Sequence, residues 1–170
     1  MSMQKIYIGI GSNLGDRLKN LQNAITLADD QGVFKVLKRS AIYESSPFGW
    51  SGKATNFYNA VLEVKSDLTA HVLMKHLQGI EQSLGRMPAP RNAPRVIDLD
   101  ILFYGDRIVD LPDLKVPHSS IEKREFVLVP LCEIAQDFMH PKSGKTACEL
   151  LEALGPYKEG RVLRRLTWPE

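Results

Sequence analysis

The stretch Arg95-Val96-Ile97-Asp98-Leu99-Asp100-Ile101-Leu102-Phe103 decides the fold, because two carboxylates interrupt an apolar run at alternate positions. Side chains of a β-strand point alternately to the two faces of its sheet, so this pattern predicts a strand. One face would carry Ile97, Leu99, Ile101 and Phe103, and the other would carry Val96, Asp98, Asp100 and Leu102. The two aspartates therefore lie side by side on one face of the predicted strand.

These two carboxylates admit two interpretations. At roughly 3.3 Å per residue, their Cβ atoms lie about 6–7 Å apart, and two acids at that separation can hold hard cations between them. A divalent ion would also offset their mutual repulsion. Alternatively, the polar face meets water and Asp98 or Asp100 pairs with Arg95. This stretch alone leaves both interpretations open.

Length and composition predict one globular domain over residues 1–170. The chain has 170 residues, of which 44% are hydrophobic, enough for one proper core and too few for two ordinary domains. Its net charge of +2, from 22 basic and 20 acidic side chains, does not by itself make a nucleic-acid-binding surface. We therefore expect any anion site to come from local clustering of charge.

The first residues, Met1 to Lys5, lead straight into a strand-like run with no long apolar stretch. This predicts neither a signal peptide nor a membrane span, and a cytoplasmic location. Cys132 and Cys148 have no C-x-x-C spacing, so in a reducing compartment we expect them to be buried free thiols.

The hydrophobic periodicity predicts an α+β fold with a mainly antiparallel sheet. Strands are expected at residues 5–10 and 56–64, with further β-formers over 33–44. Helices are expected after each of the two strands. Ser12 or Asn13 would cap the first, with Leu14, Leu18, Leu21, Ile25 and Ala28 buried, and residues 66–69 would cap the second, which ends at Gly85. A hairpin signal at 104–107 predicts that the aspartate strand pairs antiparallel with a short strand at 108–109, which argues against a parallel doubly wound sheet.

Two glycine-rich stretches are not nucleotide-binding motifs. A dinucleotide fingerprint would need glycine at Leu14, and Gly15 comes one position late. The run Gly144-Lys145-Thr146 lacks the earlier glycine and the preceding strand of a P-loop, so it is interpreted as a helix cap. Gly11 lets a ligand or another backbone approach closely, or serves a tight turn.

Residues 86–95 contain three arginines and three prolines but no acid, and they cannot form a helix. Such a loop brings Arg86, Arg91 and Arg95 next to the aspartate strand. A solvated basic loop is the simpler interpretation. However, arginines without acidic partners beside unpaired aspartates are better explained by an anionic, metal-bound ligand such as a polyphosphate.

An asparagine within the strand at 56–64 indicates a second kind of ligand. The amide of Asn59 can read the edge of a heterocycle while Phe57 supplies a flat apolar wall. The alternative is an edge-strand asparagine bonded to backbone. The long loop over 45–53, with Phe48 and Trp50, is typical of mobile functional loops.

Three motifs together resemble the 6-hydroxymethyl-7,8-dihydropterin pyrophosphokinase family. They are Gly11-Ser12-Asn13-Leu14-Gly15-Asp16, then Arg91-x-x-Pro94-Arg95-x-Ile97-Asp98-Leu99-Asp100-Ile101-Leu102, and Val116-Pro117-His118 followed by Arg124-x-Phe126-Val127-Leu128-x-Pro130-Leu131. The resemblance runs from Lys5 to about Ile134. It implies a ferredoxin-like α+β sandwich and an enzyme that moves diphosphate from ATP to the hydroxymethyl group of a reduced pterin, leaving AMP, in folate biosynthesis.

The resemblance also implies a role for particular residues. Asp98 and Asp100 match ligands of two Mg²⁺ ions, and Arg86 and Arg95 match catalytic arginines that hold the phosphates. The positions that match ATP contacts are Gln78, Glu81, Arg91, Ile101, Lys115, His118 and Arg124. The positions that match the pterin pocket are Gly11, Ser46, Pro47, Phe48, Phe57, Asn59 and Phe126.

One departure concerns how the site closes. Some members carry an aromatic residue in the arginine loop that closes over the pterin, whereas this chain has Asn92 near that place. Either Trp50 supplies the stacking or the loops close differently. The chain is expected to be a monomer whose partners are the two small substrates.

Two rival classes fit the pattern less well. An RNA-binding module would need an aromatic-glycine signature on a central strand, which residues 57–61 lack. A two-metal phosphohydrolase would use the same aspartates but needs more acidic and histidine ligands than converge here.

Overall fold

The computed structural model describes residues 4–155 and 160–170. In chain order its elements are β1 (Ile6–Ser12), α1 (Arg17–Asp30), β2 (Lys35–Arg39), β3 (Ile42–Ser45), β4 (Phe57–Lys65), α2 (Ala70–Ser83), β5 (Asp98–Tyr104), β6 (Val109–Leu111), β7 (Leu114–Val116), a 3₁₀ turn (Ile121–Lys123), α3 (Glu125–Ile134), α4 (Ala147–Glu152) and β8 (Val162–Leu166). Residues 86–97 contain no helix or strand, as the prolines predicted.

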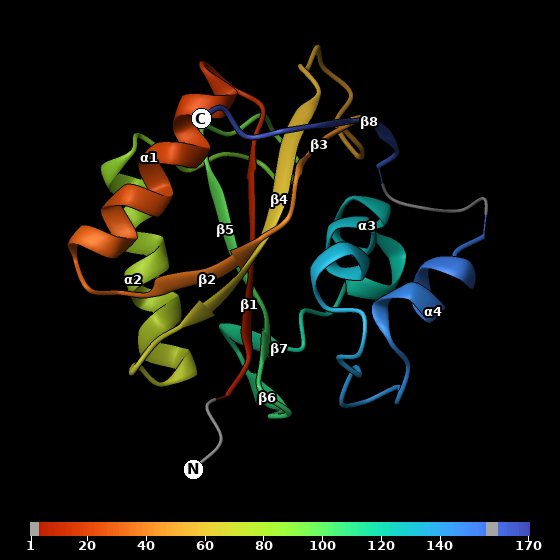
Figure 1. Cartoon of the computed structure of the whole chain (residues 1–170). Helices are drawn as coiled ribbons and strands as arrows, with labels where there is room; N and C mark the ends of the chain where they lie inside the picture. The colour runs from red at the N-terminus through yellow and green to blue at the C-terminus, as the bar shows by residue number, and fades with distance from the viewer. Residues whose placement is uncertain (1–3, 156–159) are drawn as a thin grey trace.

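The main sheet has the order β5-β1-β4-β3-β8, with β2 also paired to β4, and each of these pairings is antiparallel (Figure 1). The ferredoxin-like arrangement is a β-α-β-β-α-β succession in which the last strand lies beside the first; here β1, α1, β4, α2 and β5 follow it, and β2 and β3, which both pair with β4, share the place of the second strand. The predicted α+β class and antiparallel sheet are confirmed.

The predicted strand partner of the aspartates is wrong. β5 pairs with β1, whereas β6 pairs with β7 in a separate two-stranded sheet. The turn after β5 explains the difference, because Gly105 has φ 58° and its N–H donates to the carbonyl of Lys5 at 2.8 Å. This bond ties the end of β5 to the start of β1, so the chain leaves the main sheet before β6 begins.

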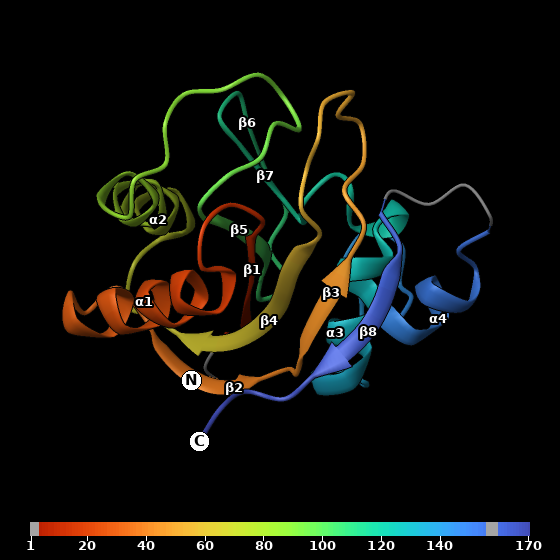
Figure 2. The ribbon, with the colours of Figure 1, turned by 90° about the horizontal axis from the view of Figure 1, so that it is seen from above.

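Helices cover both faces of the sheet (Figure 2). α1 and α2 pack on one face over a core that includes Ile8, Leu62 and Leu99, and α3 and α4 pack on the other over Tyr7 and Val61. The strand predicted at 56–64 is therefore confirmed, with successive side chains on opposite faces. The sheet forms the middle layer of three.

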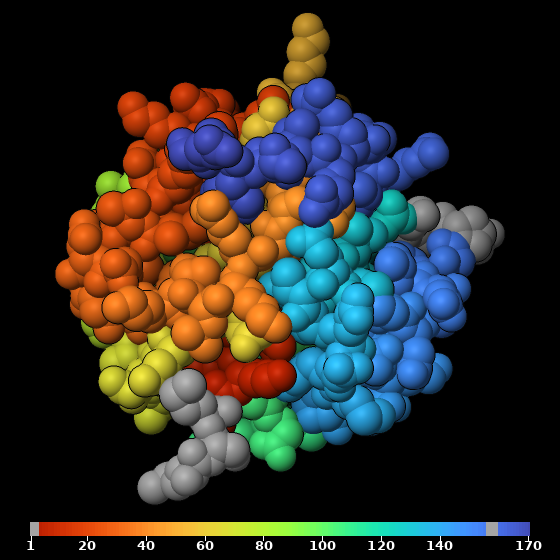
Figure 3. All heavy atoms as spheres, in the orientation of Figure 1, coloured from red at the N-terminus to blue at the C-terminus, as the bar shows by residue number. Residues whose placement is uncertain are grey.

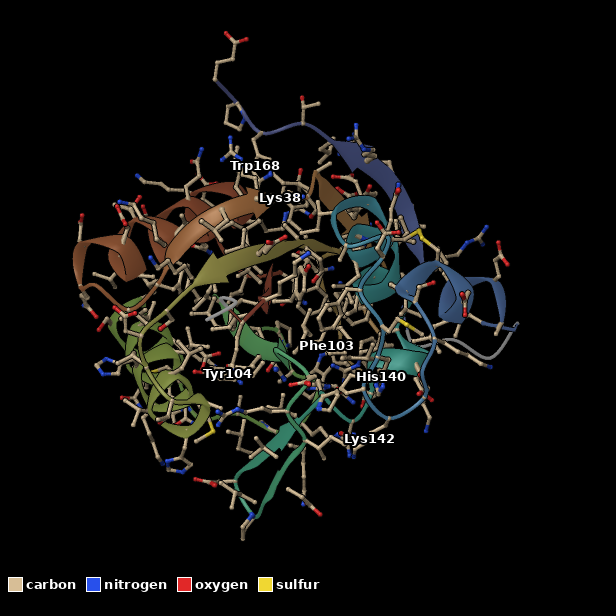
Figure 4. The ribbon with its side chains drawn as sticks, turned by 60° about the horizontal axis from the view of Figure 1, so that its bottom comes forward. Lys38, Phe103, Tyr104, His140, Lys142 and Trp168 are labelled. Carbon is tan, nitrogen blue, oxygen red and sulfur yellow. A yellow bond between two sulfur atoms is a disulfide. The ribbon has the colours of Figure 1, made fainter. Side chains whose placement is uncertain are left out.

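A β-bulge changes the face of Phe103. The pairing of β1 with β5 shifts register between Tyr7 and Ile8, which face Phe103 and Ile101, so Leu102 has no partner of its own. An extra residue breaks the alternation of a strand, so Phe103 joins Leu102 on the α3 face. The prediction that Phe103 shares a face with Ile101 is wrong. In Figure 4, Phe103 lies on the side of His140 and Tyr104 on the side of α2.

The first helix starts later than predicted. Its N-cap is Asp16, whose Oδ1 accepts a hydrogen bond from the N–H of Lys19 at 3.1 Å, because Ser12 still belongs to β1. Leu14 consequently lies outside the helix and is 48% exposed, so its predicted burial is wrong. The caps at Thr69 of α2 and Thr146 of α4 are confirmed.

The cysteines are paired, which corrects the prediction of free thiols. Cys132 in α3 and Cys148 in α4 form a disulfide, with their Cα atoms 4.9 Å apart. Their spacing in the sequence gave no sign of this pairing, because it depends on the packing of α4 against α3. In the part of the chain that the structure describes, no helix has both the length and the apolar character needed to cross a membrane.

The core on the α3 face predicts a contrast between two leucines. Leu128 in α3 is fully buried, whereas Leu163 in β8 is 49% exposed. Leu128→Ala should lower the free energy of unfolding by about 2–5 kcal/mol, because it leaves a cavity in a packed layer. The matched variant Leu163→Ala should change it by less than about 0.5 kcal/mol. Urea denaturation of both measures this, and equal effects would contradict the assigned packing.

Candidate active site

A large cavity of about 830 Å³ lies between α2, the arginine loop (residues 86–95), the start of β5 and the β6–β7 turn. The residues predicted to bind metal or ATP, or to hold its phosphates, are all found in its walls. They are Gln78, Glu81, Arg86, Arg91, Arg95, Asp98, Asp100, Ile101, Lys115, His118 and Arg124. The predicted convergence of acids and guanidinium groups on one cavity is confirmed.

A small cavity of about 80 Å³ lies against β1 and β4 on the α3 side of the sheet. Its walls include Gly11, Phe48, Phe57, Asn59 and Phe126, which were predicted to contact a pterin. Ser46 and Pro47, which share that prediction, do not line it. Trp50 lines neither cavity, whereas Asn92 lines both.

The two cavities meet at the aspartates. Their shared walls are Asn92, Arg95, Asp98, Asp100 and Arg124. The register of the sheet explains the meeting, because Gly11 of β1 is paired with Asp98 and Gly9 with Asp100. Glycine has no side chain to fill the space beside a carboxylate, so an opening remains on this face of the sheet.

Asp98 is held by two arginines. Its Oδ1 accepts from a terminal nitrogen of Arg86 at 3.0 Å, and its Oδ2 accepts from one of Arg95 at 3.3 Å. The prediction that these arginines and this aspartate lack partners is wrong. The arginine loop folds back over the strand because Arg95 and Asn13 exchange hydrogen bonds: the N–H of Arg95 donates to Asn13 Oδ1 at 2.8 Å, and the N–H of Asn13 donates to the Arg95 carbonyl at 3.1 Å.

Glu81 of α2 supports the aspartate strand from the other face of the sheet. Its Oε2 accepts from the N–H of Leu99 at 2.9 Å and also from Arg86. Burial raises the pKa of Glu81 to about 7, and the negative charge of Asp98 adds to the effect. Since the side chain is only 8% exposed and already bonded, Glu81 serves as a buried part of the wall of the large cavity.

Asp100 lies in a strongly anionic environment. Burial raises the pKa of its carboxyl well above the usual range, and the charges of Asp98 and Glu81 raise it further. Arg124 and Arg86 act in the opposite direction. A ligand that brings positive charge next to Asp100 would favour its ionised form.

Three further donors stand on the far wall of the large cavity. The N–H of His118 donates to the carbonyl of Leu102 at 3.1 Å, which fixes the histidine beside β5 after a cis Val116–Pro117 peptide bond. Lys115 forms an ion pair with Asp110 on the same hairpin. Arg124 extends over the rings of Phe48 and Phe126, with centroid distances of 5.4 and 5.7 Å.

Asn59 has a fixed orientation at the small cavity. Its Nδ2 donates to Ser45 Oγ at 2.6 Å, so it is bonded to a side chain of the neighbouring strand and not to backbone. A Cβ at Gly11 would lie 2.6 Å from Asn59 Oδ1. Gly11 is therefore required for the close approach of this amide, which keeps an acceptor oxygen at the cavity.

The sequence did not predict that Asn13 and Asn92 join the loops around the two cavities. Asn13 is buried and joins the arginine loop to Thr55, since its Nδ2 donates to that carbonyl at 3.3 Å. Asn92 has φ 65°, a rare conformation for any residue but glycine, and its Nδ2 donates to the carbonyl of Gly49 at 3.4 Å. Neither contact has a signal in residue spacing, because each joins loops distant in sequence.

Comparison with known proteins gives the family. The family model described as 7,8-dihydro-6-hydroxymethylpterin-pyrophosphokinase (HPPK) matches residues 7–136. The chain belongs to this family. A Methylorubrum extorquens protein named 2-amino-4-hydroxy-6-hydroxymethyldihydropteridine pyrophosphokinase is 40% identical over 161 residues, which cover 94% of this chain and 99% of that protein.

Other HPPK relatives are longer. The folic acid synthesis protein of Pneumocystis carinii is 41% identical over 151 residues, covering 89% of this chain; this chain spans only 20% of that relative and of its Dictyostelium discoideum counterpart. A crystal structure of wild-type Plasmodium falciparum HPPK-DHPS with pterin and p-hydroxybenzoate has a TM-score of 0.70 at 14% identity. The structural match covers 90% of this chain and 42% of that chain, and at this identity it shows only that the folds are alike.

The bond from Glu81 to Leu99 predicts a loss of stability when its acceptor is removed. Glu81→Ala should lower the free energy of unfolding by about 1–3 kcal/mol, because the buried N–H of Leu99 loses its partner. Glu81→Gln keeps an amide oxygen at that place and should retain more of the stability. Chemical denaturation compares the two, and an alanine variant as stable as the glutamine variant would refute this supporting role.

Proposed function

We propose that the protein transfers the terminal diphosphate of ATP to the hydroxymethyl oxygen of 6-hydroxymethyl-7,8-dihydropterin and releases AMP, a step of folate biosynthesis. One observation carries this proposal. A large cavity with arginines and a small cavity with aromatic walls meet at Asp98 and Asp100. The family membership and the name of the Methylorubrum relative support the same reaction.

The large cavity suits a nucleotide triphosphate. Arg86, Arg91 and Arg95 provide planar donors that match phosphate oxygens, and His118 and Lys115 stand opposite them. Arg86 and Arg95 would turn from Asp98 toward the phosphates when ATP binds. Gln78 and the backbone of Ile101 would contact the nucleoside.

The small cavity suits a flat heterocycle. Phe57 and Phe126 offer apolar walls, and the amide oxygen of Asn59 accepts hydrogen bonds from a ring edge. The hydroxymethyl group of a bound pterin would then point toward the shared wall at Asp98. This places the attacking oxygen beside the phosphates.

The residues present fit two Mg²⁺ ions as cofactors. Asp98 and Asp100 are hard oxygen donors on one face of a strand, and burial, followed by the charges of Asp98 and Glu81, raises the pKa of Asp100. Among residues 4–155 and 160–170, no group of three or more His, Cys, Asp and Glu side chains could hold a metal. Substrate oxygens and water would therefore supply the other ligands. Magnesium held by Asp98 and Asp100 would supply positive charge that neutralises the phosphates.

The transfer itself is a displacement at the β-phosphorus. The hydroxymethyl oxygen forms a bond to this phosphorus while the bond to the oxygen bridging the α- and β-phosphorus breaks, so AMP leaves with that oxygen. The hydroxyl proton passes to water, since the site offers no obvious general base. The protein contributes position and charge stabilisation, which suffice for phosphoryl-type transfer.

Two loops would exclude bulk water, the competing nucleophile, from the phosphates. Residues 46–53 and the arginine loop are already joined by the hydrogen bond from Asn92 to Gly49. Because Trp50 lines neither cavity, the structure favours closure through Asn92 over stacking by Trp50. A monomeric state and a cytoplasmic location stay predictions.

The rival classes have less support. In the described part of the chain, helices pack on both faces of the sheet, which argues against an open sheet face as a platform for RNA (Figure 2). A phosphohydrolase can be distinguished from the proposed enzyme by its reaction products. Incubation with MgATP and the pterin, followed by chromatography, should give equal amounts of AMP and pterin diphosphate, whereas ADP or free phosphate as the main product would overturn the proposal.

The aspartates predict a sharp effect on turnover. Asp98→Asn and Asp100→Asn should each lower kcat by about 10²-fold or more, because each removes charge where the phosphates react. Asp106→Asn, an exposed residue just beyond β5, is the control and should keep full activity. AMP formation measures all three, with circular dichroism to confirm folding. Wild-type turnover in either site variant would contradict the assignment.

A further inference from the structure

The C-terminal segment contacts the start of the loop over residues 46–53, part of which lines the small cavity. The N–H of Ser46 donates to the carbonyl of Arg161 at 2.9 Å, and the N–H of Arg161 donates to Ser46 Oγ at 3.0 Å. Just before this loop, Ser45 of β3 is paired with Val162 of β8. Residues 160–162 thus fix the point where the chain leaves β3 for Phe48.

The same segment is tied to the start of α3. The N–H of Val162 donates to Glu125 Oε1 at 3.0 Å, next to Phe126 in sequence. Phe48 and Phe126 in turn stack with ring centroids 5.6 Å apart. The C-terminal strand is therefore hydrogen-bonded to residues that lie close in sequence to both Phe48 and Phe126. In Figure 3 the atoms of this segment, in blue, form one surface with those of α3.

Gly160 touches the back of one of these rings. It is buried and has φ +71°. A Cβ at this position would lie 2.8 Å from Cδ1 and 3.1 Å from Cε1 of Phe126, and 3.3 Å from the carbonyl oxygen of Ser46. Only glycine permits both this conformation and this close approach. A larger residue at position 160 fits only if the ring of Phe126 moves.

We infer that Gly160 and residues 161–162 are positioning residues for the pterin: they do not line the small cavity themselves, but they pack against Phe126, which does, and set its place. This inference rests on the proposed function, since it assigns the pterin to that cavity. The segment lies outside residues 7–136 matched by the family model, so it is a feature of this chain beyond the matched region.

The test is Gly160→Ala with a matched control. Gly32 also has a positive φ of +67°, but a Cβ there meets nothing within 4 Å. Gly32→Ala thus reproduces the backbone strain without the contact to Phe126. We expect Gly160→Ala to raise both the KM and the Kd for the pterin about tenfold or more, with the KM for MgATP unchanged, because overpacking displaces the ring. Gly32→Ala should leave all three at the wild-type values.

A second variant keeps the test decisive if Gly160→Ala folds poorly. Phe126→Leu opens space behind the cavity, so the pterin Kd of the double variant should match that of Phe126→Leu alone. A Gly160→Ala protein that binds the pterin like Gly32→Ala would overturn the inference, as would fully multiplicative effects in the double variant. Absence of AMP formation by the wild type would refute the proposed function instead, while the Kd comparison would still decide the role of Gly160.

Discussion

The site depends on the register between β1 and β5. Antiparallel pairing sets Gly11 beside Asp98 and Gly9 beside Asp100, so two residues without side chains face two carboxylates. A Cβ at Gly11 would lie 2.6 Å from Asn59 Oδ1, and one at Gly9 would lie 3.3 Å from a methyl carbon of Leu102, so a larger residue on that face of β1 would displace side chains that line the small cavity. The register is held by the buried side chains of Ile6, Ile8 and Ile10, which would move to the wrong face if the strand slipped by one residue.

The negative charge of Asp98 is balanced by arginines of a loop and not by residues of the sheet. Asp98 is shared between Arg86 and Arg95, and the loop that carries them is held by Asn13. Ion pairs that are partly exposed contribute little to stability. They do keep the guanidinium groups of Arg86 and Arg95 at Asp98. Under the proposed function, these arginines would exchange the carboxylate for the phosphates of ATP.

Much of this could be predicted from local pattern. The alternation around Asp98 and Asp100 identified their shared face, and the prolines of the arginine loop excluded a helix there. Asn59 stood out because an amide is unusual within an apolar strand. These features concern residues close in sequence, where the geometry of a strand or a loop determines which side chains lie next to each other.

What the pattern missed depends on contacts across the fold. The bulge at Leu102 reversed Phe103, and the disulfide of Cys132 with Cys148 required α4 to pack on α3. The sequence did not single out Gly160, because its role depends on its contact with the ring of Phe126, which belongs to another element. Arg86 and Arg95 were correctly placed at the aspartates, but their direct pairing with Asp98 depends on how the loop returns over the strand.

A crystal structure of the protein with magnesium, α,β-methylene-ATP and the hydroxymethylpterin tests the central claim most directly. It should show the phosphates in the large cavity beside Asp98 and Asp100, the pterin ring in the small cavity against Phe126, and the hydroxymethyl oxygen in line with the β-phosphorus. A nucleotide bound on the other face of the sheet, or a pterin separated from the phosphates by Arg95, would contradict it.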